Sequence, residues 1–173
     1  MSSNYPSSEA KKASFWISQI VIIIATVGGV YLAASQGLKQ AIQFDSIKSE
    51  QNNYFLRKSL QNELADNVGY IREYADKVKR QIVNADLNLE TFVWNSMTYS
   101  PVALETPSEL LREAQKFYHS AADIMANKNF QPRNRAENLT ALADHVEKNV
   151  LGKFEANTKA LRETLRQRGI SVE

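Results

Sequence analysis

The sequence predicts an all-α protein in which one N-terminal transmembrane helix is followed by an antiparallel bundle of three to four long helices. Three observations lead to this fold class: a long uncharged apolar run near the N-terminus, long stretches without proline, and apolar residues that recur at helical spacing. They divide the chain into a polar tail at 1–12, a membrane helix at 13–37 and an extramembrane domain at 38–173.

The apolar run at 15–34 is long enough to cross a bilayer as a helix. It reads FWISQIVIIIATVGGVYLAA, and about 20 residues at roughly 1.5 Å each span a hydrocarbon core about 30 Å thick. Because backbone groups inside a bilayer must be satisfied within the segment, the run should be helical despite its β-branched residues. Basic and aromatic residues typical of membrane interfaces flank it; they are Lys11, Lys12, Phe15, Trp16 and Tyr31.

A cleaved signal peptide is the alternative interpretation of the same run. Lys11 and Lys12 would form its basic region, and Leu32-Ala33-Ala34 would form its cleavage site. The apolar stretch nevertheless continues past Gly28-Gly29, so it exceeds the roughly 7–15 residues of a signal-peptide core. We therefore favour an uncleaved anchor over a secreted helical protein.

The residues before the run determine the expected orientation. They are polar, Ser-rich and interrupted by Pro6, so we expect a disordered tail. Lys11 and Lys12 lie on this side, but Lys39 and Lys48 lie close to the other end, so the positive-inside bias is small. It favours a single-pass protein of a bacterial inner membrane, with a cytoplasmic N-terminus and a periplasmic C-terminal domain.

Small residues recur at every fourth position of the membrane helix, at Ala25, Gly29, Ala33 and Gly37. Steps of four residues place them in one slowly spiralling stripe on a single helix face. Because lipid tails give no hydrophobic drive for association, membrane helices pack through small residues that let the backbones approach. The stripe predicts a helix-packing face, and chance in a span containing Gly and Ala is the alternative.

The chain after the span has the apolar register of a coiled coil. Apolar residues alternate at steps of three and four from Leu64 to Phe92, with Val78 and Ile82 in the predicted seam. We expect two helices that meet at Asp66-Asn67-Val68-Gly69, the second ending near residue 95. This turn signal is weak, and one continuous helix remains the alternative.

Capping signals bound the later helices. Residues 95–105 should form a loop, and Thr106-Pro107-Ser108-Glu109 combines an N-cap threonine, a proline at the first helical position and a glutamate three residues on. A helix should follow to about residue 126. The last helix should run from about 133 to 168 and close on Gly169-Ile170 in a Schellman motif.

The motifs of common enzymes are absent. The chain has no cysteine and two histidines, which excludes thiol nucleophiles and thiolate metal sites, and it has no phosphate-binding loop, nucleophile elbow or HExxH motif. His119 with Asp123, and His145 with Asp144 and Glu147, would form a metal site only if their helices met. We expect surface histidines instead, and no catalytic residue, cofactor or metal.

An aromatic-rich cluster at Phe92, Trp94, Met97 and Tyr99 lies where the helical pattern ends. Aromatic side chains are favoured at interfaces because they bury a large area at low entropic cost. The cluster is therefore a candidate partner contact. Closure of the end of the bundle core is the alternative, and we favour closure.

These patterns favour a non-enzymatic, membrane-anchored accessory, scaffold or assembly subunit of a membrane complex. Its expected partners are the bilayer and either a second copy of the chain or another membrane protein. The net charge of +2 gives no indication of nucleic-acid binding. An extracytoplasmic sensory or ligand-binding domain that signals through a partner is the alternative, and an enzyme is less favoured.

Overall fold

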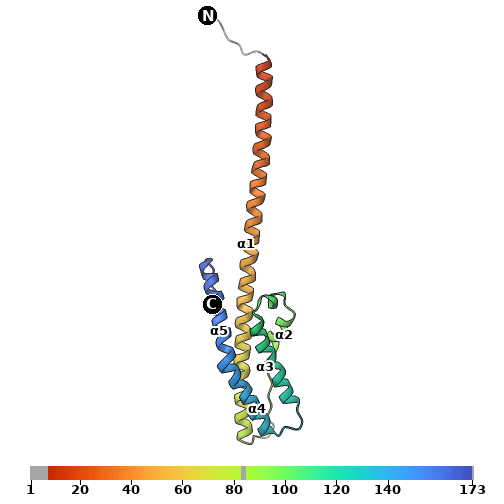
Figure 1. Cartoon of the computed structure of the whole chain (residues 1–173), viewed down its shortest axis with the longest axis vertical. Coiled ribbons are helices and arrows are strands. Elements are labelled where there is room, and N and C mark those ends of the chain that lie inside the picture. Colours follow the sequence, from red (N-terminus) through yellow and green to blue (C-terminus); the bar gives the residue numbers. More distant parts are fainter. Residues whose placement is uncertain (1–7, 83–84, 173) are drawn as a thin grey trace. The chain divides into compact units, whose positions relative to one another are not determined.

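The computed structural model describes residues 8–82 and 85–172 of the chain, and every element within these ranges is helical. A long N-terminal helix with an apolar segment is followed by shorter helices that pack together (Figure 1). This confirms the all-α fold class. The elements are α1 (Ser8–Lys79), α2 (Phe92–Thr98), the 3-10 helix η1 (Pro101–Glu105), α3 (Ser108–Ala126), α4 (Pro132–His145), the π-helical turn η2 (Val146–Val150) and α5 (Leu151–Gln167).

Backbone contacts divide the chain into two units, Met1–Ser46 and Ile47–Glu173. In the first unit α1 begins at Ser8, so residues 8–12, which the sequence assigns to the disordered tail, are helical; residues 1–7 lie outside the described part. The apolar side chains of this unit are more than half exposed, as at Ile24 and Leu32. Among the described residues, α1 is the one helix with a segment long and apolar enough to cross a membrane.

The second unit has its own hydrophobic core, formed by the later part of α1 together with α3, α4, η2 and α5. Within this unit α3 runs in the same direction as α1, and α4 to α5 return in the opposite direction (Figure 1). Many apolar residues of the later helices are buried. The fully enclosed large side chains include Leu60, Leu64, Ile71, Phe117, Leu139, Val146, Val150, Phe154 and Leu165.

The predicted division of α1 near Asp66-Asn67-Val68-Gly69 is wrong, because the helix continues through these residues to Lys79. It ends in a Schellman motif: the Ile82 N–H donates to the Lys77 carbonyl at 3.0 Å and the Gln81 N–H donates to the Val78 carbonyl at 3.0 Å. Gln81 takes the left-handed position with φ 56°. A glutamine there carries no sequence signal for a helix end, since glycine is the usual residue.

The seam predicted through Ile82 therefore stops with the helix, and Ile82 is 49% exposed. From residue 85 the chain returns along the bundle without helical structure. Ala85, Leu87 and Leu89 pack against the core, while the residues between them are exposed. This alternation has the period of two that is typical of an extended segment. The predicted second helix is therefore helical up to Lys79, as part of α1, and an extended return takes its place at residues 85–91.

The ends of the later helices follow the predicted caps in part. α3 begins at Ser108 after Pro107, but no side-chain hydrogen bond caps it. Thr106, the expected capping residue, is buried and does not cap the helix. At the C-terminus the Ile170 N–H donates to the Leu165 carbonyl at 3.0 Å, and Gly169 has φ 78°. This confirms the predicted Schellman closure.

Candidate interaction surface

A buried arginine attaches α1 to the end of η1 and to α5. The Arg57 side chain is 5% exposed, and its Nη2 donates to the Glu105 carbonyl at 2.5 Å while Nε donates to Thr106 Oγ1 at 3.3 Å. Its Nη1 donates to Asn157 Oδ1 of α5 at 2.9 Å. Burial lowers the pKa of Arg57, and the nearby Glu105 carboxylate opposes this shift. We call this group the Arg57 clamp.

A buried carboxylate on α1 holds the start of α2. Glu63 is 4% exposed and accepts hydrogen bonds from the Val93 N–H at 2.5 Å, the Trp94 N–H at 3.0 Å and the Tyr118 hydroxyl at 2.6 Å. Burial, followed by the hydrogen bond to Glu63, raises the pKa of Tyr118, so this phenol stays protonated and continues to donate. We call this group the Glu63 clamp.

One turn further along α1, Asn67 fixes the extended return. Its Nδ2 donates to the Glu90 carbonyl at 2.7 Å, and its Oδ1 accepts from the Glu90 N–H at 2.8 Å. Asn67 is fully buried. Because an extended segment outside a sheet has backbone groups without regular partners, a side-chain amide that both donates and accepts satisfies them.

The four residues of the predicted aromatic cluster point in different directions: two face the core and two face solvent. Trp94 is partly buried and stacks on Tyr118 with ring centroids 5.3 Å apart, and Met97 is fully buried. Phe92 and Tyr99 are 80% and 91% exposed. Trp94 and Met97 therefore contribute to the core, whereas Phe92 and Tyr99 are open to solvent.

The outward side chains lie on neighbouring segments of the domain. Phe92 and Tyr99 lie seven residues apart, close to two full turns, so they share one face of α2. Ser100 follows at once and lines a groove of about 320 Å³ together with Phe55 and Leu56 of α1. Leu104 of η1 is 90% exposed. We define the α2 surface as Phe55, Phe92, Tyr99, Leu104 and this groove.

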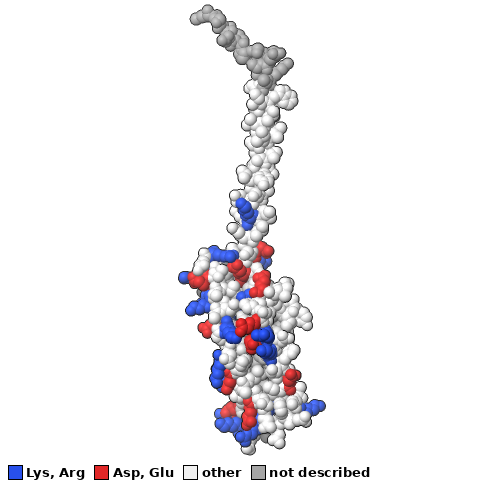
Figure 2. All heavy atoms as spheres, viewed as in Figure 1, with Lys and Arg blue, Asp and Glu red and all other residues white. Residues whose placement is uncertain are grey.

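The α2 surface differs from the rest of the domain in charge. Residues 91–104 contain no acidic or basic side chain, and the exposed Glu90 and Glu105 border them. The part of the domain where α2 lies is largely white in Figure 2, while acidic and basic side chains of both signs cover much of the remaining domain. Exposed apolar surface on a folded domain marks an interaction site when it is contiguous.

The small-residue stripe of the first unit is open. Ala25 and Ala33 are exposed, and a Cβ added at Gly29 or Gly37 would meet no atom within 4 Å. The other faces of this segment are exposed as well, so the helix-packing role of the stripe stays a prediction.

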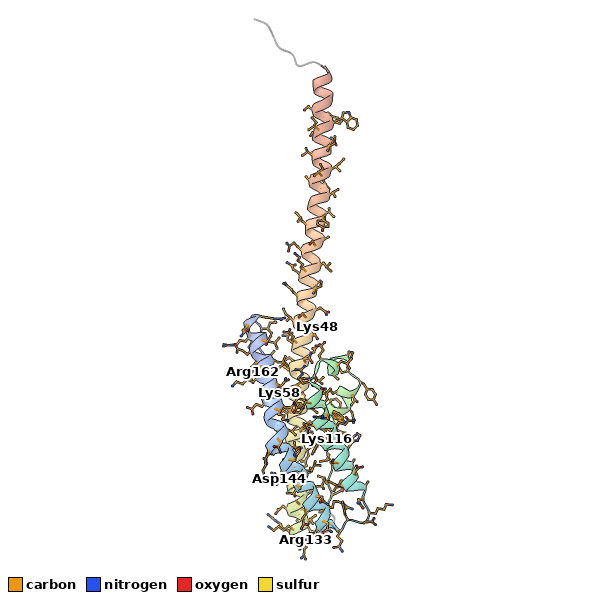
Figure 3. All side chains as sticks on the ribbon, in the orientation of Figure 1. Lys48, Lys58, Lys116, Arg133, Asp144 and Arg162 are labelled. Atoms are coloured by element: carbon orange, nitrogen blue, oxygen red, sulfur yellow. The ribbon has the colours of Figure 1, made fainter. Side chains whose placement is uncertain are left out.

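The predicted histidine groups do not come together. His145 Nε2 lies 3.5 Å from Glu113 of α3, whereas its neighbours Asp144 and Glu147 both pair with Arg72 of α1, at 2.9 Å and 2.6 Å. In Figure 3 Asp144 lies between Lys116 and Arg133 along the bundle. Within the described residues no group of three or more His, Asp or Glu side chains is arranged to hold a metal ion.

A second hollow lies where α1 ends and α4 begins. This cleft has a volume of about 600 Å³, and its lining includes Val78, Lys79, Gln131, Pro132 and Arg133. Its volume is in the range of small-molecule pockets. Its lining mixes a few apolar side chains with charged and amide groups.

Comparisons with known proteins give no relative: no family model, no curated protein and no solved structure matches the chain. The fold itself defines a class, a chain with one apolar helix and an all-α bundle. Since fold alone does not determine function, the exposed surfaces of the domain are what bear on it.

Proposed function

We propose that this chain is a single-pass membrane protein whose helical domain acts as an accessory, scaffold or assembly subunit of a membrane complex. The exposed apolar segment of α1 supports an anchor, because a run of apolar side chains about as long as the hydrocarbon core of a bilayer is thick would otherwise face water. The balance of flanking lysines favours a cytoplasmic N-terminus. We propose a bacterial inner membrane, in which the helical domain would be periplasmic.

The observation that carries the assembly role is the α2 surface. Phe92, Tyr99 and Leu104 are at least 80% exposed on a segment held by two groups of buried polar residues. Burying Arg57 and Glu63 costs desolvation energy that only their hydrogen bonds offset. Such groups restrict the segment to one conformation, and that conformation directs its large apolar side chains outward.

We assign the domain no catalytic activity, cofactor or metal. A sensory or ligand-binding domain is the second candidate, and the 600 Å³ cleft between α1 and α4 favours it. The cleft lining gives no convergent set of buried polar groups, whereas the α2 surface presents several large apolar side chains to solvent. The assembly role is therefore the stronger proposal.

The test is the size of the complex that the full chain forms in its native membrane. After extraction in mild detergent, wild type should migrate on a native gel as an assembly larger than a single chain. The double variant Phe92→Ser and Tyr99→Ser should lose this assembly, since two side chains that are 80% and 91% exposed would no longer be covered. Its melting temperature should not change.

Ile82→Ser is the matched control, because Ile82 is also an exposed apolar residue but lies beyond the end of α1, outside the α2 surface. It should keep the native assembly. An assembly of the same size in all three proteins would refute the proposed role of the α2 surface.

A further inference from the structure

The area of the α2 surface is close to what a symmetric contact between two identical chains requires. At roughly 200 Å² for each large side chain, the exposed fractions of Phe55, Phe92, Tyr99 and Leu104 present roughly 600 Å². Two copies meeting through this surface would bury about twice that area. The result lies at the lower end of the range of about 1,200–2,000 Å² for specific protein interfaces.

The surface also has the shape of a self-complementary contact. In a twofold interface the same patch serves both partners, so a projecting group must lie next to a hollow that can receive its copy. Tyr99 projects with 91% exposure, and the adjacent residue Ser100 lines the groove of about 320 Å³ with Asn52, Phe55 and Ser59. A projecting aromatic ring and a receiving groove are thus neighbours on one chain.

The absence of charge favours a second copy over a different protein. Charge patterns usually select one partner and reject others, and a charged patch repels its own copy. Residues 91–104 carry no charge, so the centres of two α2 surfaces can meet without repulsion, with Glu90 and Glu105 at the edges. Anchoring in one membrane gives both copies the same orientation and raises their effective concentration, which strengthens a contact of modest area.

We propose that the α2 surface binds the α2 surface of a second copy of this chain, with Tyr99 of each copy entering the groove of the other. The inference rests on the proposed assembly role and names the partner at that site. The resulting dimer has its twofold axis along the membrane normal, because both copies are anchored in the same direction.

The chain contains no cysteine, so a single introduced thiol reports the contact without background. Ser96 lies on α2 between Phe92 and Tyr99 and is exposed. The purified full-length Ser96→Cys protein, reconstituted in phosphatidylcholine vesicles, should form dimers with a short bis-maleimide crosslinker. Lys159→Cys is the control, because this exposed residue lies on α5, on the other side of α1 from α2 (Figure 1).

Adding Tyr99→Glu to Ser96→Cys should lower the crosslinked fraction roughly tenfold or more, since each copy would place an unpaired carboxylate in the groove of the other. Tyr99→Phe should keep it. The melting temperature of each variant distinguishes loss of contact from loss of folding, and it should not change because Tyr99 is exposed.

Crosslinking of Ser96→Cys no greater than that of Lys159→Cys would overturn the inference. If the native-membrane assembly still depended on Phe92 and Tyr99 in that case, the surface would bind a different protein, and the proposed function would stand. A third outcome is that the Ser96→Cys protein does not crosslink and its thiol becomes unreactive only when vesicles are present. The α2 surface would then bind lipid, and the inference would be overturned.

Discussion

Changing Ile71 to aspartate is expected to unfold the helical domain. Ile71 lies on α1 in the main core and is fully buried, so the variant would place a carboxylate among apolar side chains with no cation to pair it. An unpaired buried charge costs at least several kcal/mol, which is a large part of the roughly 5–15 kcal/mol that stabilises a typical domain.

The measurement is near-ultraviolet circular dichroism of the full chain in detergent during heating, since the stack of Trp94 on Tyr118 gives the domain a tertiary signal. Ile82→Asp is the matched control. Ile82 is 49% exposed, so its variant should melt close to wild type. Equal melting of the two variants would mean that the core register of α1 differs from the one described.

Truncation of Glu63 should have the second-largest effect. Glu63→Ala leaves the Val93 and Trp94 N–H groups and the Tyr118 hydroxyl without their acceptor. Each unsatisfied buried donor costs about 1–3 kcal/mol, so we expect a loss of roughly 3–5 kcal/mol in the free energy of unfolding. Glu63→Gln keeps one acceptor oxygen and should lose about half as much.

Glu155→Ala is the control for this substitution, because Glu155 is an exposed glutamate of α5. Its free energy of unfolding, measured by urea titration, should stay within about 0.5 kcal/mol of wild type. If Glu63→Ala behaved like Glu155→Ala, the Glu63 clamp would not position α2.

The sequence predicted the elements whose signals are local. The apolar run specifies the long N-terminal helix, and the helical spacing of Leu110, Ala114 and Phe117 matches the buried face of α3. The Gly169-Ile170 closure was predictable as well, because glycine is the residue that adopts positive φ without steric cost. In each case the residues that determine the structure are close together in the chain.

The end of α1 and the extended return were not predictable in the same way. Gln81 takes a left-handed conformation, which glutamine rarely adopts and which the sequence therefore does not predict. The apolar residues that follow continue a helical register by coincidence, although Ala85, Leu87 and Leu89 also alternate with period two. That alternation was the available signal for an extended segment.

The sequence identified the segment that carries the candidate interaction surface. It did not predict which side chains of that segment face the core and which face solvent. The aromatic residues between Phe92 and Tyr99 identify the segment, whereas the inward or outward direction depends on the two clamps. Arg57 and Glu63 bond with residues more than 25 positions away, and polar residues of a predicted helix are usually assigned to its solvent face. Their roles follow only from the packed structure.

The central claim is that an uncleaved helix anchors this domain in a membrane, and alkaline carbonate extraction of native membranes tests it most directly. The Lys159→Cys chain should remain in the pellet, and its intact mass should include the apolar segment 15–34. An impermeant thiol reagent should label it in intact spheroplasts. A carbonate-soluble protein whose mass corresponds to a chain that starts near Ser35 would contradict the account. It would identify a cleaved signal peptide.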